Sequence, residues 1–341
     1  MNIQEALTEV IDGKHLGYQG MADVMSQIMT GEATPAQIGG FLIALRMKGE
    51  TVEEVAGAAS VMRELASGVT TQATNTVDIV GTGGDATSTF NISTASSLVA
   101  ASAGVSIAKH GSRSVSSKSG ASDVLEAAGV NVSLEPEQVA QCVDQLNIGF
   151  MFAPAFHSAM KHAIGPRREM GVRTIFNLLG PLTNPAGAPN QVLGVYDVAW
   201  VKPLAEVLQR LGSRHVMVVH SDDGMDEISC CAPTHVAELR NGKIESYTID
   251  PASLGISGHN LSDLQVDSVE RSLQKIQSVL ADEPGAARDI VRLNAGAAIY
   301  VAGLAPTYEA GVAKATETLA SGKVAETLAA LAKLSQTFNK A

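Results

Sequence analysis

Hydrophobic positions recur at three- and four-residue spacing through the first 70 residues, and this spacing predicts amphipathic helices. Ile3–Ile11 and Met21–Met29 follow it. Two more helices are indicated by a threonine that stands three residues before a Gln or Glu, at Thr34–Gln37 and Thr51–Glu54. No alternating strand pattern interrupts these pieces. The pattern therefore predicts a small all-helical N-terminal domain over residues 1–70.

From Val77 onward the pattern changes to short β-branched runs that alternate with helical segments. This alternation predicts a larger α/β domain over residues 76–341 with a mostly parallel central sheet. The expected strands are Val77–Val80, Val105–Ala108, Val130–Val132, Ile148–Phe152, Gln191–Val195 and His215–His220, followed by a hairpin of Val236–Leu239 and Ile244–Thr248. The expected helices are Ala95–Ala103, Ser122–Ala128, Pro136–Leu146 and Val201–Leu211, a helical region over His157–Leu179, and most of the chain after Ser268.

Ligands of such sheets bind beyond the carboxyl ends of parallel strands, so the polar clusters that follow strands are the candidate sites. The first cluster is Gly81-Thr82-Gly83-Gly84-Asp85, after which Asn91-Ile92-Ser93-Thr94 leads into a helix. Glycines allow close approach of the backbone, and the first N–H groups of a helix attract anions. A tight turn would also use glycines, but the hydroxyl-rich connection that follows favours a phosphate site.

The second cluster, from Lys109 to Ser119, reads KHGSRSVSSKS. A solvated surface loop is one interpretation of this composition. A loop that binds a phosphorylated sugar explains more of it, because Lys and Arg supply charge while serine hydroxyls satisfy further phosphate oxygens. His110 is not assigned as a base, since a single histidine is more often structural.

The third cluster contains Asp226 and Glu227, after the strand that ends near His220. A solvated acidic turn is the alternative to a Mg²⁺ site, in which one or two carboxylates and the phosphates of a substrate share the ion. If both carboxylates serve metal ions they should lie in a turn, and Ser93 could add a hydroxyl ligand. Asp85 is expected to organise its own loop.

Charge and composition narrow the class of protein. The formal net charge of −11 over 341 residues argues against non-specific binding of nucleic acid. The N-terminus lacks a signal pattern, and no apolar run approaches the roughly 20 residues that a membrane span needs. The cysteines Cys142, Cys230 and Cys231 form no disulfide framework or metal-site spacing. We therefore expect a cytoplasmic enzyme with no membrane and no nucleic-acid partner.

No pair of nucleophile and base stands out along the chain. This favours a reaction driven by departure of a leaving group and by electrostatic stabilisation, so no acid, base or nucleophile is assigned. His157 and Arg167 are ten residues apart in a helical region, and each alone is more often an ordinary surface or capping residue. Arg167 could bind a carboxylate with two hydrogen bonds.

The glycine cluster, the Asn91–Thr94 motif, Lys109-His110-Gly111 with Arg113, and Asp226-Glu227 resemble the anthranilate phosphoribosyltransferase family, which belongs with the nucleoside phosphorylase-like phosphoribosyltransferases. RTIFNLLGPLTNP, over 173–185, is similar too, and the resemblance spans essentially the whole chain. It implies transfer of the 5-phosphoribosyl group of phosphoribosyl pyrophosphate to the amine of anthranilate in tryptophan biosynthesis. It also implies a homodimer, two Mg²⁺ ions per subunit, and part of residues 163–179 joined to the helical domain.

The resemblance assigns residues to each ligand. Anthranilate would be met by Gly81, Ser112, His157 and Arg167, and the Mg²⁺ ions by Ser93, Asp226 and Glu227. The phosphoribosyl pyrophosphate site would contain Gly81, Gly83, Gly84, Asp85, Thr89, Asn91, Ile92, Ser93, Thr94, Lys109, His110, Gly111, Ser112, Arg113, Ser116 and Ser117.

Two departures from the family pattern affect these expectations. Ser112 stands where the family usually has Asn, so the acceptor is expected to be held more loosely or through water. Ala121 removes a hydroxyl found in the family's usual SGSAD. Three alternatives stay open: a pyrimidine nucleoside phosphorylase, a nucleic-acid-binding relative without transferase activity, and a transferase for another aromatic amine.

Overall fold

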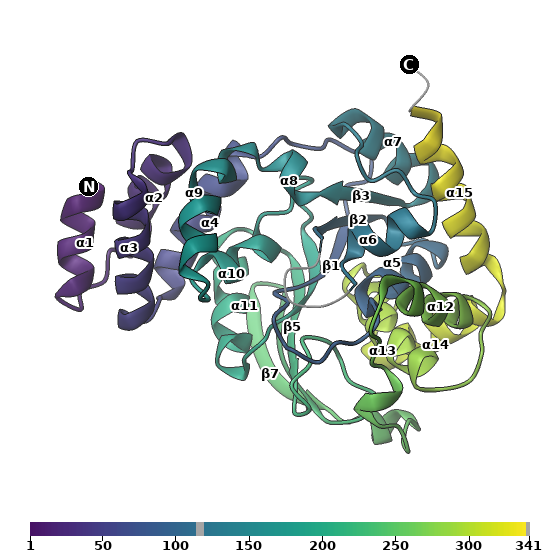
Figure 1. Ribbon diagram of the computed structural model, residues 1–341. Coiled ribbons are helices and arrows are strands. Elements are labelled where there is room, and N and C mark those ends of the chain that lie inside the picture. Colours follow the sequence, from purple (N-terminus) through teal and green to yellow (C-terminus); the bar gives the residue numbers. More distant parts are fainter. Residues whose placement is uncertain (114–118, 339–341) are drawn as a thin grey trace.

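The structure is a computed structural model that describes residues 1–113 and 119–338. The N-terminal helices are α1 (Ile3–Ile11), α2 (Gly17–Thr30), α3 (Pro35–Lys48) and α4 (Val52–Leu65). Both predicted capping boxes are present, at the starts of α3 and α4, and the predicted helical bundle is confirmed. Helix α9 (Lys161–Met170) comes from much later in the chain and packs against α2 and α3 (Figure 1).

Seven strands of the described chain form one sheet in the order β3-β2-β1-β4-β5-β6-β7. The first five in chain order pair in parallel, whereas β6 and β7 pair antiparallel, so the predicted mostly parallel sheet is confirmed. The strands are β1 (Val77–Gly81), β2 (Ile107–Gly111), β3 (Ile148–Phe152), β4 (Asn190–Gly194), β5 (His215–Ser221), β6 (Thr234–Arg240) and β7 (Lys243–Ile249).

Helices cover both faces of this sheet. Along β5, Val216 and Val218 join the core shared with the bundle, while Met217 and Val219 face the opposite core, as the two-residue period of a strand requires. The remaining helices are α5 (Ile92–Ser102), α6 (Ala121–Ala127), α7 (Pro136–Leu146), α8 (Ala153–Phe156), α10 (Phe176–Leu179), α11 (Val201–Arg210), α12 (Val269–Leu280), α13 (Ala286–Val301), α14 (Tyr308–Ala320) and α15 (Lys323–Thr337).

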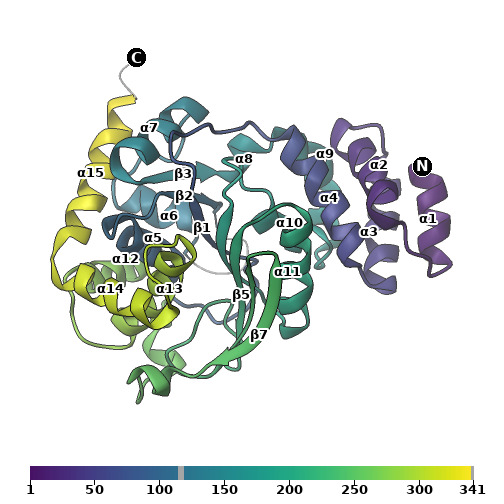
Figure 2. The ribbon, with the colours of Figure 1, turned by 180° about the vertical axis from the view of Figure 1, so that it is seen from behind.

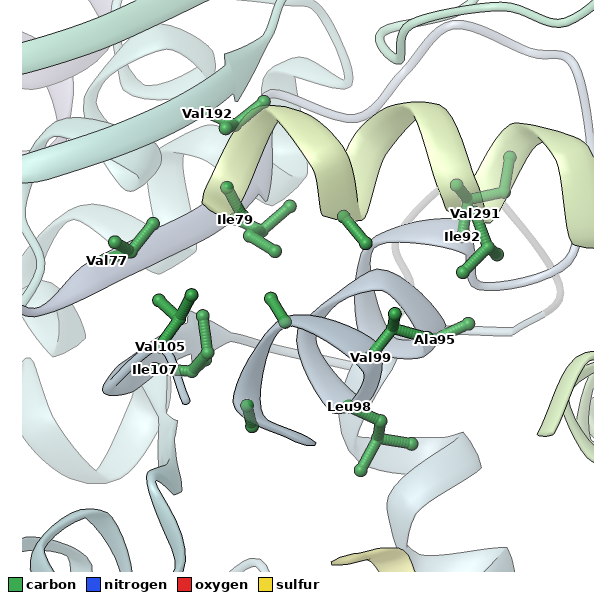
Figure 3. Packing of buried hydrophobic residues seen from close by; sticks show 14 of the residues in the cluster. Val77, Ile79, Ile92, Ala95, Leu98, Val99, Val105, Ile107, Val192 and Val291 are labelled. Carbon is green, nitrogen blue, oxygen red and sulfur yellow. The ribbon is translucent and has the colours of Figure 1, made fainter. Parts of the chain in front are cut away.

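The bundle and the C-terminal helices lie at opposite ends of the molecule (Figures 1 and 2). On the face away from the bundle, Val77 and Ile79 of β1 belong to the same buried cluster as Val99 of α5 and Val291 of α13 (Figure 3). These contacts fix α5 directly behind the carboxyl end of β1, which is where the first polar cluster lies.

One predicted strand is absent from the described structure, and several helices and strands begin at other residues than predicted. Val130–Val132 is not a strand, because these buried side chains pack into the core while the Asn131 N–H donates to Ser335 Oγ of α15 at 2.9 Å. Helix α5 begins at Ile92, three residues earlier than expected, because Asn91 caps it. Strand β2 begins at Ile107, two residues later than expected.

Helices α13 and α14 cross at a pair of glycines, Gly296 and Gly311. A Cβ atom added at Gly311 would lie 2.3 Å from the Gly296 carbonyl oxygen. We expect Gly311→Ala to lower the free energy of unfolding by about 1–3 kcal/mol through overpacking. Urea unfolding measures this, with Gly165→Ala as the control, since a Cβ atom on this α9 residue meets nothing within 4 Å. Equal effects of the two substitutions would contradict the close crossing.

Candidate active site

The loops that follow β1 and β5 meet at the carboxyl edge of the sheet, although β4 lies between these strands. The loop after β5, residues 222–233, crosses the end of β4 so closely that a Cβ atom at Gly194 would lie 1.5 Å from the Asp226 carbonyl oxygen. Asp226 Oδ2 then accepts a hydrogen bond of 2.8 Å from the Gly83 N–H. A Cβ atom at Gly81 would lie 2.3 Å from that same carboxylate oxygen. Glycine is therefore required at both strand ends.

The glycine loop, residues 82–91, connects β1 to α5. Asp85 accepts hydrogen bonds from the N–H and hydroxyl of Thr87, which confirms its expected role in organising the loop. Thr89 bridges to Gln265, and the Phe90 N–H donates to the Leu264 carbonyl at 3.0 Å. The loop is thus held from the side of α12 as well as by Asp226.

The N-terminus of α5 has the features of an anion site. Asn91 Oδ1 accepts from the Thr94 N–H at 3.0 Å, and Asn91 Nδ2 donates to the Ser119 carbonyl, which brings the start of α6 alongside. In the described part of the chain, the buried hydroxyls of Thr94, Ser119 and Ser122 have no hydrogen-bond partner. Buried hydroxyls are normally paired, so these three point to a ligand with several acceptor oxygens.

Lys109 places a buried positive charge beside this helix terminus. Its ammonium donates to the Ile79 carbonyl at 2.7 Å and to Ser93 Oγ at 3.1 Å. Burial lowers the pKa of Lys109, and the nearby carboxylates of Asp78 and Glu227 act in the opposite direction. The ammonium therefore lies near both the glycine loop and the loop after β5, residues 222–233, which we call the acidic loop.

Asp226 and Glu227 lie in a bend after β5, as their proposed role requires. Burial, and next the Asp85 carboxylate, raise the pKa of Asp226 to about 7. Burial, and next Asp226, raise the pKa of Glu227 well above its usual range, although Lys109 opposes this. Carboxylates that are buried together and repel one another are stabilised by a bound cation.

A buried pair is formed by His110 of β2 and His157, which follows α8, with ring centroids 5.1 Å apart. His110 hydrogen-bonds the backbone of Gly180 and His157 that of Thr183, while both Nε2 atoms lack a partner among the described residues. Burial, and next His157, lower the pKa of His110 to about 3; burial also lowers the pKa of His157. Both rings are therefore neutral, with Nε2 as a free acceptor.

Arg167, on α9, stacks over the ring of Phe176 with its Cζ atom 4.8 Å from the centroid. Burial lowers the pKa of its guanidinium, and among residues 1–113 and 119–338 no carboxylate pairs with it. A partly buried guanidinium without an anion is costly, so it favours binding of an anionic group such as a ligand carboxylate.

Not every expected residue is turned toward this centre. The Ser112 hydroxyl donates to the Arg113 carbonyl at 2.9 Å, and the exposed Arg113 guanidinium pairs with Asp123 at 2.7 Å and Glu126 at 2.8 Å on α6. Ser116 and Ser117 lie outside the described residues. Gly81, Gly83, Gly84, Asp85, Thr89, Asn91, Ile92, Ser93, Thr94, Lys109, His110, Gly111, Asp226 and Glu227 lie along this edge, on the two loops, the start of α5 and β2.

Sequence reasoning missed several residues that support the site. Asp78 accepts from the His110 N–H at 3.1 Å and from Asn184 Nδ2 at 2.7 Å, and burial raises its pKa to about 6. Ser119 is the last residue of the predicted phosphate-binding loop but is not among the assigned ligands, and the sequence pattern assigns no role to Ser122 or Arg173. Asn184 and Arg173 both lie in the RTIFNLLGPLTNP stretch, whose polar residues were the available signal.

The described residues contain no group of three or more His, Cys, Asp or Glu side chains arranged around a metal ion. They also contain no helix that is long and apolar enough to cross a membrane. The candidate oxygen ligands for a metal ion are the carboxylates of Asp226 and Glu227 in the acidic loop and the hydroxyl of Ser93 in α5.

Comparison with known proteins agrees with this arrangement. Residues 4–66 match "Glycosyl transferase family, helical bundle domain" and residues 73–325 match "Glycosyl transferase family, a/b domain". The chain is 60% identical to the anthranilate phosphoribosyltransferase of Thioalkalivibrio sulfidiphilus over 328 residues, which are 96% of this chain and 97% of the relative.

Solved structures give the same result. The crystal structure of anthranilate phosphoribosyltransferase from Thermus thermophilus superposes with a TM-score of 0.92 at 41% identity, covering 97% of this chain and 99% of that one. The Saccharomyces cerevisiae enzyme, in complex with PRPP and Mg, shares the fold with a TM-score of 0.89 at 24% identity, covering 98% of both chains. The chain therefore belongs to the anthranilate phosphoribosyltransferases, glycosyltransferases of tryptophan biosynthesis.

Proposed function

We propose that this edge of the sheet performs the family's reaction, in which the 5-phosphoribosyl group of phosphoribosyl pyrophosphate passes to the amine of anthranilate and pyrophosphate leaves. The observation that carries the proposal is the adjoining starts of α5 and α6, where the buried hydroxyls of Thr94, Ser119 and Ser122 have no partner in the described chain and the Lys109 ammonium contacts Ser93. A phosphorylated ligand satisfies all of these groups.

The donor site is proposed to consist of the glycine loop, the start of α5 and the end of β2. Gly81, Gly83 and Gly84 allow the backbone to approach the phosphates, and Asp85, Thr89 and Asn91 hold the loop. Ile92, Ser93 and Thr94 form the N-terminus of α5, whose N–H groups face the phosphates in this proposal, and Lys109 supplies a positive charge. His110, Gly111, Ser112, Arg113, Ser116 and Ser117 complete the proposed set.

The residues present fit Mg²⁺. Asp226 and Glu227 supply hard oxygen donors, and a cation relieves the repulsion between them. Ser93 lies near the same carboxylates, because its hydroxyl accepts from Lys109 and its backbone hydrogen-bonds Glu227. The yeast protein of the same fold was solved with PRPP and Mg, and we propose two ions per subunit held by these three residues. When bound, Mg²⁺ neutralises charge on the departing pyrophosphate.

The acceptor is proposed to enter from the side of Gly81, Ser112, His157 and Arg167. Arg167 would bind the carboxylate of anthranilate, which orients the amine toward the sugar. The amine of an aromatic acid is uncharged near neutral pH, so it can attack without prior removal of a proton.

These residues perform the chemistry by position and charge. Lys109 and the α5 N-terminus stabilise the negative charge that grows on the leaving group, so the bond at C1 breaks early and leaves an oxocarbenium-like centre. The bond between C1 and the pyrophosphate oxygen breaks, the fixed amine forms the new C1–N bond, and its nitrogen then releases one proton to solvent. Each step uses binding and orientation, in keeping with the absence of an assigned nucleophile.

The test is the loss of anthranilate fluorescence after addition of the protein, phosphoribosyl pyrophosphate and Mg²⁺. Loss that requires all three supports the assignment, and unchanged fluorescence at high protein concentration refutes it. Release of base from thymidine in the presence of phosphate would instead support a nucleoside phosphorylase. The nearly full-length similarity to anthranilate phosphoribosyltransferases favours the first outcome.

We further propose a homodimer in the cytoplasm and a helical domain made of residues 1–70 with part of 163–179, followed by an α/β domain over 76–341. Packing of α9 on α2 and α3 supports that division. Helices α1, α3 and α9 expose Ile11, Met47 and Ile164, and we propose that an interface on the bundle covers them. Sedimentation velocity measures the oligomeric state.

A further inference from the structure

Arg173 lies between α9 and α10, and it contacts three separate parts of the molecule. Its Nη2 donates to the Gly84 carbonyl in the glycine loop. Its Cζ atom lies 4.5 Å from the ring centroid of Tyr196, which follows β4. Its own carbonyl accepts a hydrogen bond from Arg46 Nη1 on α3. The guanidinium of Arg173 therefore connects the glycine loop to the segment after β4. The backbone carbonyl of Arg173 connects this residue to the helical bundle.

The glycine loop needs such external contacts. Ala86 and Ser88 have φ angles of 59° and 56°, in the left-handed region that residues with a Cβ atom rarely adopt. Conformations of this kind persist only when the surroundings hold them. Asp226 holds the loop at Gly83 and the 264–266 segment holds it at its far end, so Arg173 provides the hold at Gly84, between them.

Resting on the proposed function, we propose that Arg173 is a positioning residue that keeps the glycine loop in its donor-binding conformation. Because Arg46 of α3 donates to the Arg173 carbonyl, the position of Arg173 depends on the position of the helical bundle. Arg173 then acts on the pyrophosphate end of the donor through Gly84 rather than by touching the donor itself. The bundle, which carries the acceptor-side Arg167 on α9, is thereby coupled to the donor side of the site.

Steady-state kinetics of Arg173→Ala tests the proposal. We expect the KM for phosphoribosyl pyrophosphate to rise about tenfold, because a hydrogen bond and a cation–π contact are lost together. The kcat and the KM for anthranilate should change by less than about twofold, since neither contact touches the acceptor. Arg173→Lys should recover part of the loss, because its ammonium can still donate to the Gly84 carbonyl. Equal increases in both KM values would overturn the proposal.

Arg46→Met tests the link to the bundle. We expect it to raise the same KM by a smaller factor, about threefold, and to add nothing when combined with Arg173→Ala, because both act through one connection. Fully additive effects, or no effect of Arg46→Met, would contradict the link. Tyr196→Phe is the matched control for the stacked ring and should leave the KM unchanged, whereas Tyr196→Leu should raise it.

A binding measurement separates this inference from the activity. Calorimetry with inorganic pyrophosphate and Mg²⁺ should give a dissociation constant that rises about tenfold in Arg173→Ala. If the wild-type protein binds pyrophosphate normally but does not consume anthranilate, the proposed reaction is refuted and the role of Arg173 is not. Unchanged binding in Arg173→Ala, with an unchanged thermal midpoint, would refute the role of Arg173 alone.

Discussion

Glu227→Gln is expected to lower Mg²⁺-dependent turnover by roughly 10³-fold, because Lewis-acid stabilisation of a leaving group is worth several kcal/mol. The substitution keeps the shape of the side chain and removes its charge, which the acidic loop needs to share a cation with the donor. The Glu227 side chain is half-buried near Asp226, and loss of solvent around it, and next this repulsion, raise the pKa of Glu227. Fluorescence assays over a range of Mg²⁺ concentrations measure the loss.

The same substitution should stabilise the protein in the absence of Mg²⁺. A carboxylate whose pKa is raised by burial and by like charge opposes folding at neutral pH, so replacing it with an amide should raise the urea midpoint. Asp222→Asn is the control on the same loop, since Asp222 is exposed and pairs with His235 at 2.8 Å. Near-normal turnover of Glu227→Gln, or a fall in its urea midpoint, would contradict the assignment.

A sequence predicts those parts of the site that depend on local rules. Strand ends, capping boxes and the Asp226-Glu227 pair follow local rules, so the glycine loop, the bundle and the bend of the acidic loop were all predictable. Crossing of β4 by the acidic loop was not predictable, because it depends on the strand order and on the missing side chain at Gly194.

Other features that local patterns do not show also depend on contacts between distant parts of the chain. Val130–Val132 has the composition of a strand but is buried near α15, where Ser335 lies 204 residues beyond Asn131, so local composition could not exclude pairing. Arg113 is predicted to bind phosphate from its neighbours in sequence, and this local pattern does not show that its guanidinium also pairs with Asp123 and Glu126 on α6. Arg173 belongs to a recognisable motif, but its contacts with Gly84 and Tyr196 join segments 89 and 23 residues away.

Arg167→Ala is expected to raise the KM for anthranilate by about 10- to 150-fold, with a much smaller effect on the KM for phosphoribosyl pyrophosphate. A hydrogen-bonded charge pair contributes about 1.5–3 kcal/mol, and this guanidinium has no carboxylate partner in the described residues to compete with a ligand. Arg167→Lys should give an intermediate value, because an ammonium keeps the charge but loses the planar pair of donors.

Arg168→Ala is the matched control, since this neighbouring side chain on α9 is exposed. Loss of stacking on Phe176 is the competing explanation for an Arg167→Ala effect, and benzoate, which has the carboxylate but no amine, separates the two. If Arg167 binds the carboxylate, inhibition by benzoate should weaken by the same factor as anthranilate binding. Equal effects on both substrates, with inhibition by benzoate unchanged, would place the carboxylate elsewhere and leave Arg167 a packing role.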